Sequence, residues 1–209
     1  EYLRHRMSTC SEASATVTAS GTLDHPQAHP NLSAMLLAAG HGTRLAPLTD
    51  LVPKPLCPVG NTPMIDMALG HASDQTDHTI VNVHGFRDEF ERWRPSGIDL
   101  SVEKELLGTA GGVANVASWV GDDDLLVINS DALLIGDIGP FVSSWDRATI
   151  RLLVTPDPRR PDFEGMWRFA GASLMPSRTV HELAEGFSDL YRAAWLPAQQ
   201  AGRLPREMP

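Results

Sequence analysis

The sequence predicts an α/β fold in which a mainly parallel sheet, Rossmann-like, is covered by helices on both faces. Short apolar runs alternate with helix-forming segments along the chain, which is typical of βαβ units. The first apolar run, AMLLAAG from Ala34, ends in glycine, as a buried parallel strand does before a turn. A length of 209 residues with 42% hydrophobic residues fits one domain with a full core.

Strands are expected at six apolar-rich segments: 35–39, 79–84, 98–105, 124–131, 149–157 and 166–175. Helices are expected at 62–72, 87–93, 110–119 and 140–146, with a long final helix at 179–202. The first helix has Thr62 as its expected N-cap and Pro63 in its first turn, where the missing N–H is not needed. Residues 1–32 are rich in Ser, Thr, Ala, Pro and His, and we expect a flexible tail before a domain at 33–209.

Charge and composition exclude several classes of protein. The formal net charge of −9 argues against a basic face for nucleic acid. Two cysteines cannot build a disulfide framework or a four-ligand zinc site, so a reducing compartment is expected. No run approaches the roughly 20 apolar residues of a membrane span, and no apolar signal-peptide region is visible. The sequence therefore predicts a cytoplasmic protein that binds neither nucleic acid nor membranes.

The segment LLAAGHGTRLAPLTDLVPKPLCPVG, residues 36–60, carries the strongest chemical signal. Gly40 and Gly42 follow a strand and let backbone N–H groups approach a phosphate, to which Arg44 adds a fixed positive charge. A tight turn with an exposed arginine is the alternative. A dinucleotide-binding fingerprint fails, because Leu45 replaces the third glycine and prolines prevent the long helix that should follow.

Lysine usage singles out one more residue in this segment. The chain has two lysines, Lys54 and Lys104, against fifteen arginines. Pro53 and Pro55 flank Lys54 and stiffen its backbone, which would aim the compact ammonium at a fixed point. A chance exposed lysine is the alternative.

The run LAAGHGTRLAPLTDLVPKPL resembles the signature of the sugar-1-phosphate nucleotidyltransferases, the NDP-sugar pyrophosphorylases. The resemblance implies the fold of that family and two catalytic residues: Arg44, which would grip the triphosphate, and Lys54, which would contact the sugar phosphate and the α-phosphate. It also implies that the nucleotide is held by Leu37, Ala38, Ala39, Gly40, Gly42 and Thr43.

A second segment, ELLGTAGGVANV at 105–116, resembles the family's base-binding turn. Its L-G-T-A-G pattern is similar to that of mannose- or heptose-1-phosphate guanylyltransferases, and its pair of glycines resembles that of the N-acetylmuramic acid 1-phosphate uridylyltransferase. The resemblance implies nucleotide contacts from Glu105, Gly108 and Thr109. From the residues alone, glycines at a helix start permit close approach and Thr109 can cap the helix, while a plain strand-to-helix turn stays open.

The metal and sugar residues also follow from the resemblance. Asp131 ends an apolar strand where the family places a metal-binding aspartate, and Mg²⁺ favours one or two carboxylates with phosphate oxygens. Ser130 stands where the family usually has glycine. Sugar contacts are expected from Asn82, from Gly171, and from Glu164 as a weak substitute for the family's Glu-Lys pair.

The resulting expectation is an Mg²⁺-dependent enzyme that joins a nucleoside triphosphate to a sugar 1-phosphate and releases pyrophosphate. The family continues into a segment W-x-D-x-G-T with a second metal-ligating aspartate, and the printed sequence reaches Pro209 without it. A domain lacking its usual C-terminal end is therefore expected, with a catalytically impaired sugar-nucleotide binding or regulatory module as the alternative function. Arg44 and Lys54 are ten positions apart, which favours sugar phosphates over molybdopterin as substrate. The base, the sugar and the oligomeric state stay open.

Overall fold

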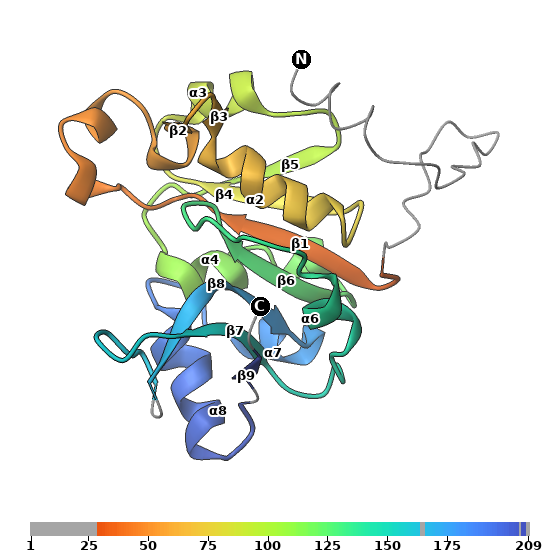
Figure 1. Ribbon diagram of the computed structural model, residues 1–209. Helices are drawn as coiled ribbons and strands as arrows, with labels where there is room; N and C mark the ends of the chain where they lie inside the picture. The colour runs from red at the N-terminus through yellow and green to blue at the C-terminus, as the bar shows by residue number, and fades with distance from the viewer. Residues whose placement is uncertain (1–28, 164–165, 205, 208–209) are drawn as a thin grey trace, which may run out of the picture.

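The computed structural model describes residues 29–163, 166–204 and 206–207. A sheet of seven strands runs through the middle of the molecule in the order β5-β4-β1-β6-β8-β7-β9 (Figure 1). Its first four strands are mutually parallel, β8 is antiparallel to both β6 and β7, and β9 runs parallel to β7. The strands are β1 Leu32–Leu37, β4 Thr79–Val83, β5 Ile98–Val102, β6 Asp124–Asn129, β7 Arg151–Pro156, β8 Trp167–Met175 and β9 Arg206–Glu207.

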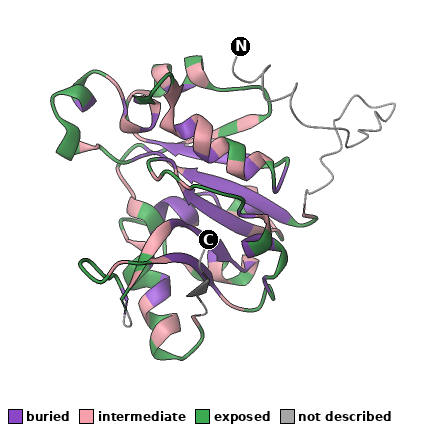
Figure 2. Ribbon diagram, viewed as in Figure 1, coloured by how far each residue is buried: buried purple, intermediate pink, exposed green. Residues whose placement is uncertain are grey.

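Helices cover both faces of this sheet, which confirms the predicted fold class. They are α2 Met64–Ser73, α3 Arg87–Trp93, α4 Gly108–Asn115, α5 Ala117–Val120, α6 Gly139–Ser143, α7 Ser177–Glu182 and α8 Leu196–Gln200, with a π-helix, η4, at Tyr191–Trp195. One core cluster packs α2, α3 and α6 on the sheet, and the other packs α4, α5, α7 and η4. The buried strands between these two clusters form the band at the centre of Figure 2.

Strands at the predicted positions follow from the apolar runs, because both faces of the central strands are buried. The prediction for the first helix was wrong at its start. Thr62 and Pro63 form the short strand β3, paired with β2 Pro58–Val59, and α2 begins at Met64 without a side-chain cap. Other boundaries differ as well: β1 runs over Leu32–Leu37 rather than 35–39, and β5 ends at Val102 rather than at 105. Helix α6 ends at Ser143 rather than at 146, and Val116 separates α4 from α5.

The predicted long helix at 179–202 was wrong. Helix α7 ends at Glu182, and the chain then crosses to α4 before η4 and α8 resume helical structure. Gly186, with φ +97°, adopts a backbone conformation that interrupts a helix. Ser188 holds this crossing segment, residues 183–190, against the start of α4: its amide donates to the Leu107 carbonyl, and its carbonyl accepts from the Ala110 amide.

The predicted N-terminal tail lies mostly outside the described residues. Where the description starts, the His29 amide already donates to the Gln75 carbonyl at 2.8 Å, so contacts with the domain begin before residue 33. No helix in the described ranges is long and apolar enough to cross a membrane.

Candidate active site

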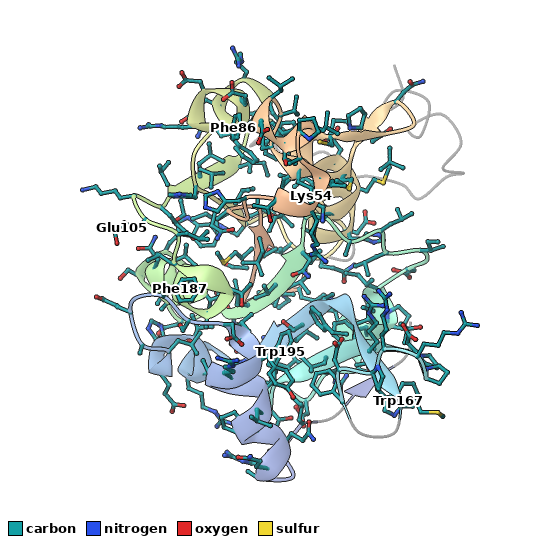
Figure 3. All side chains as sticks on the ribbon, turned by 90° about the vertical axis from the view of Figure 1, so that its left-hand side faces the viewer. Lys54, Phe86, Glu105, Trp167, Phe187 and Trp195 are labelled. Atoms are coloured by element: carbon teal, nitrogen blue, oxygen red, sulfur yellow. The ribbon has the colours of Figure 1, made fainter. Side chains whose placement is uncertain are left out.

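The candidate site lies at the carboxyl ends of β1 and β6, which are adjacent parallel strands. The loop after β1 carries the glycine-rich segment, and the turn after β6 carries Asp131. Ligands bind at such strand ends in open α/β sheets, because loops there converge while the strands stay rigid. Figure 3 views the molecule from the side to which these strands run, with Lys54 near the centre.

The loop after β1 offers unpaired backbone donors. The amides of Gly40, His41, Gly42 and Thr43 donate to no acceptor within the part of the chain that the structure describes. Gly40 is exposed, and a Cβ built on it would meet nothing within 4 Å. Consecutive free N–H groups beside open space form a concavity suited to phosphate oxygens, as the sequence predicts.

Gly42 has a second role, because the lysine segment packs directly on it. Its φ is +64°, and a Cβ there would lie 2.9 Å from Thr49 Cγ2 and 3.0 Å from Lys54 Cβ. Thr49 Oγ1 also donates to the Gly42 carbonyl at 3.1 Å. Glycine is therefore required for the chain to return across its own loop and bring Lys54 beside the free amides.

Lys54 Nζ forms an ion pair with Asp131 Oδ2, which joins the two motifs across 77 positions of sequence. The lysine side chain is 23% exposed and the aspartate 38%, so solvent and ligands can reach the pair. Arg44 is exposed in the 3-10 turn Thr43–Leu45, on the same loop. The structure thus brings Lys54 and Asp131 into contact and leaves Arg44 available to a ligand.

Ser130, which replaces the family's glycine, has its hydroxyl bonded to the backbone at the end of β1. Ser130 is fully buried and its Oγ donates to the Leu37 carbonyl at 2.5 Å. The serine hydroxyl therefore ties the end of β6 to the end of β1.

A buried polar network supports the loop from behind. Asn82 Oδ1 accepts a hydrogen bond from the Ala38 amide at 2.9 Å, and Asn82 Nδ2 donates to Glu103 Oε1 at 2.7 Å. Glu103 Oε2 accepts from the Leu107 amide at 3.0 Å. Asn82 and Glu103 are 2% and 4% exposed. The side chain of Asn82, which was expected to contact the sugar, is therefore already hydrogen-bonded within this network.

Glu103 is a residue that the sequence reasoning missed. The predicted acidic residue, Glu105, is exposed and forms no hydrogen bond or ion pair with other described residues (Figure 3). Glu103 instead links β4 to the turn before α4. A Cβ on Gly112 would lie 2.8 Å from Asn82 Nδ2 and 3.0 Å from Glu103 Oε1, so that glycine makes room for the network.

Two glycines of the expected base-binding turn are explained by the crossing segment 183–190. A Cβ on Gly108 would lie 2.4 Å from the Ser188 carbonyl oxygen, and one on Gly111 would lie 2.0 Å from that of Gly186. The Ala110 amide donates to the Ser188 carbonyl at 3.0 Å. These contacts place the backbone of the crossing segment against the start of α4.

Thr109 does not cap α4, contrary to the expectation. Leu107 is the N-cap residue and makes no side-chain cap bond. Thr109 Oγ1 accepts from the Leu190 amide at 2.9 Å, which anchors the end of the crossing segment where η4 begins.

Of the two other expected sugar residues, only Gly171, in β8, is among the described residues. Gly171, with φ +111°, would place a Cβ 2.6 Å from Ala132 Cβ, so it lets β8 approach the turn that carries Asp131. Glu164 lies outside the described residues, so its predicted role stays a prediction.

A cavity of about 560 Å³ opens between α4, β8 and η4, and we call it the aromatic cavity. It adjoins the candidate site through Thr109, through Leu37 at the end of β1 and through Asn129 at the end of β6. Its lining residues are Leu37, Thr109, Val127, Asn129, Pro161, Asp162, Phe169, Ser173, Asp189, Leu190, Tyr191 and Trp195.

The arrangement around Asp131 fits a divalent cation that arrives with phosphate ligands. Mg²⁺ is commonly held by one or two carboxylates with substrate phosphates and waters. Asp131 is one accessible carboxylate beside free amides and a lysine. No group of three or more His, Cys, Asp or Glu side chains forms a metal cage in the described ranges.

Comparison with known proteins agrees with this arrangement. The family model described as nucleotidyl transferase matches residues 33–163. The chain is 32% identical over 139 residues to a mannose-1-phosphate guanylyltransferase of Mycobacterium tuberculosis, covering 61% of this chain and 39% of that protein. It is 28% identical over 201 residues to an N-acetylmuramate α-1-phosphate uridylyltransferase of Neisseria meningitidis, covering 85% of this chain and 83% of that protein.

Solved structures share the fold at lower identity. HddC from Yersinia pseudotuberculosis, in complex with GMP-PN, has a TM-score of 0.68 and 18% identity, covering 85% of this chain and 90% of that one. A Bacillus anthracis chain assigned as a glucose-1-phosphate thymidylyltransferase has a TM-score of 0.73 and 20% identity, covering 85% and 87%. The chain therefore belongs to the nucleotidyl transferase family, and within it to the sugar-1-phosphate nucleotidyltransferases.

Proposed function

We propose that this protein joins a nucleoside triphosphate and a sugar 1-phosphate to give an NDP-sugar and pyrophosphate. The observation that carries the proposal is the contact between Lys54 and Asp131, because it unites the two signature motifs beside a loop with free backbone donors. Membership of the family supports the same reaction.

The reaction needs charge neutralisation more than covalent chemistry. A phosphate oxygen of the sugar 1-phosphate would attack the α-phosphorus of the nucleotide, and the bond from that phosphorus to the bridging oxygen of pyrophosphate would break. Both substrates are anions, so positive groups must hold them together in line. No Ser, Cys or His nucleophile paired with a base stands in the motif segments, so no covalent enzyme intermediate is proposed.

Each motif residue has a role in that scheme. The amides from Gly40 to Thr43 would hold phosphate oxygens of the nucleotide, and Arg44 would stabilise the leaving pyrophosphate. Lys54 would bind the sugar phosphate and the α-phosphate. Asp131 would hold Mg²⁺, which supplies positive charge to the phosphate oxygens when bound.

The alternative function is a sugar-nucleotide binding module that keeps the same phosphate-binding loop but has no turnover. One experiment distinguishes it from the enzyme. Pyrophosphate release is measured with ATP, GTP, UTP, CTP and dTTP against a panel of sugar 1-phosphates, with Mg²⁺ and with a chelator. Release that depends on one pair of substrates, stops with the chelator and returns with Mg²⁺ is the expected result. Binding of a nucleotide by calorimetry with no release under any combination would favour the binding module.

A cytoplasmic location and the absence of nucleic-acid and membrane partners are part of the same proposal. They are supported by the net charge of −9 and by the small anionic substrates of the proposed reaction.

A further inference from the structure

Strand β5 is the last strand on one edge of the sheet and is bonded to a single neighbour, β4 (Figure 1). The two strands are parallel, with Val83 opposite Val102. The Glu103 amide donates to the Val83 carbonyl at 2.8 Å, and in a parallel ladder every second residue bonds to the same neighbour. Ser101 therefore bonds to β4, and the N–H and C=O groups of Leu100 and Val102 are directed away from the sheet.

These outward groups are unpaired in the part of the chain that the structure describes. The amides and carbonyls of Leu100 and Val102 form no hydrogen bond with any described residue. The Ile98 amide donates to the Pro95 carbonyl at 3.4 Å, whereas the Ile98 carbonyl is also unpaired within the described ranges. A row of free donors and acceptors on a sheet edge is a template for a further strand.

The two faces of β5 differ in character. Ile98 and Leu100 are half-buried against the core cluster that also packs α2 and α3. Val102, which alternation places on the same face, is 41% exposed. On the opposite face, Asp99 and Ser101 accept hydrogen bonds from side chains of α5 and α4. A strand added at this edge would therefore extend an apolar row on one face and a polar row on the other.

The charge of this edge is close to balanced, although the chain as a whole is acidic. Residues 87–102, which comprise α3, the following turn and β5, contain three arginines and four carboxylates, a net charge of −1 against −9 for the whole chain. All three arginines are paired with glutamates of α3. A second copy of this acidic protein therefore meets little like-charge repulsion along β5.

We propose that two copies of this chain pair through β5 about a twofold axis, with Leu100 of one copy opposite Leu100 of the second copy. Twofold symmetry makes the two β5 strands antiparallel. The two Leu100 residues then exchange N–H···O bonds, and each Val102 amide donates to the Ile98 carbonyl of the other copy. The free backbone groups of the edge are used in this way, and the two sheets become one continuous sheet.

Charge selects this register over the neighbouring one. Pairing centred on Leu100 places Asp99 opposite Ser101 of the second copy, so a carboxylate faces a hydroxyl. Pairing centred on Ser101 would satisfy the same backbone groups but would place Asp99 opposite Glu103 of the second copy. Like charges directly opposite each other destabilise an antiparallel pair, so the register centred on Leu100 is favoured.

Analytical ultracentrifugation of the whole chain tests the pairing. The expected result is a species of twice the chain mass that dissociates on dilution. Val102→Pro removes one outward N–H per copy, and an edge strand tolerates proline where the N–H points away from the sheet, so the dimer dissociation constant should rise by about tenfold or more. Ile135→Lys changes another exposed apolar residue, outside β5, and should leave the dissociation constant unchanged. Circular dichroism verifies that each variant is folded.

Cysteine variants test the register. In the proposed pairing, Asp99 and Ser101 of the second copy form a non-hydrogen-bonded pair with Cα atoms about 4.5 Å apart, which suits a disulfide. Asp99→Cys and Ser101→Cys proteins, both carrying Cys10→Ser, should therefore form a covalent dimer when mixed and oxidised. Neither protein should do so when oxidised alone. The remaining cysteine, Cys57, is buried.

Hydrogen exchange of the unmodified protein gives an independent readout. The Leu100 and Val102 amides should exchange slowly in the dimer and rapidly after dilution to the monomer, because only the second copy protects them. This measurement decides the matter if Val102→Pro does not fold. A monomer at every concentration, rapid exchange of both amides in the dimer, or a dimer that a folded Val102→Pro variant leaves intact overturns the proposal. Cross-linking of Ser101→Cys alone overturns the register. None of these outcomes depends on pyrophosphate release, so the proposed function is tested separately.

Discussion

The ammonium of Lys54 is paired with the carboxylate of Asp131, so the two residues expected to handle phosphate and cation neutralise each other in the free protein. Both remain partly exposed. An exposed pair of this kind contributes little to stability, because water screens the attraction and both side chains lose rotamer freedom. Its residues can therefore exchange their mutual contact for ligand contacts at low cost.

Lys54→Ala should lower the turnover number by about 10²- to 10³-fold, as expected for loss of one charge-stabilising contact. Thermal stability should change little, because the lost ion pair is exposed. Initial rates of pyrophosphate release at saturating substrates provide the measurement. Lys104→Ala, which alters the chain's other lysine, is the matched control and should keep normal turnover. Near-normal turnover of the Lys54 variant would remove Lys54 from the mechanism.

Asp131→Asn should lower turnover far more than nucleotide affinity. The amide retains the shape of the side chain but loses the charge that a divalent cation needs, whereas the free loop amides that hold phosphate are untouched. Calorimetry of nucleotide binding beside rates across a range of Mg²⁺ concentrations separates the two effects. An equal loss of affinity and turnover would place Asp131 in nucleotide binding instead.

Glu103→Ala should destabilise the protein by about 2–4 kcal/mol, because it leaves Asn82 Nδ2 and the Leu107 amide buried without acceptors. Glu103→Gln should also destabilise it, since one of its two ends would present a donor to a donor. The exposed Glu105→Ala provides the comparison and should stay within about 0.5 kcal/mol of the parent. Chemical denaturation measures all three. Equal stability of the Glu103 and Glu105 alanine variants would contradict the buried network.

The strands and the loop motifs could be predicted because their signals are local. β1 and β6 are buried on both faces, so their sequences are continuous apolar runs that can be recognised as strands. Once the strands are placed, Gly40 and Asp131, which follow them closely in the sequence, must lie near the strand ends. The crossing segment 183–190 could not be predicted in the same way. Its bonds join Ser188 to Ala110, which is far away in the sequence, and no local pattern indicates such a contact.

The choice between Glu103 and Glu105 shows the same limit inside the site. Both lie at the end of the expected strand 98–105 and both precede the glycine turn, so spacing alone does not tell them apart. What separates them is the position of Asn82 on the neighbouring strand, with which Glu103 pairs across the fold. Asp162 and Asp189, which also line the aromatic cavity, were missed for a related reason: they come from a hairpin and from the crossing segment, neither of which contains a recognisable motif.

The last prediction concerns how the crossing segment is held against α4. Gly111→Ala would place a methyl group 2.0 Å from the Gly186 carbonyl oxygen, and that contact is with backbone, which cannot rotate away. Overpacking of this kind costs about 1–3 kcal/mol, more than the roughly 1 kcal/mol that alanine gains over glycine within a helix. We therefore expect a net loss of stability, a melting temperature lower by several degrees, and faster tryptic cleavage at Arg192 as the segment detaches.

Gly70→Ala is its matched control, because Gly70 also lies in a helix, α2, but a methyl group there meets nothing within 4 Å. That variant should gain about 0.5–1 kcal/mol from helix propensity alone. The opposite signs expected for the same glycine-to-alanine change isolate the contact from the propensity. If Gly111→Ala were instead as stable as Gly70→Ala, with unchanged cleavage at Arg192, the segment 183–190 would not be packed on α4, and the wall of the aromatic cavity that depends on it would have to be redrawn.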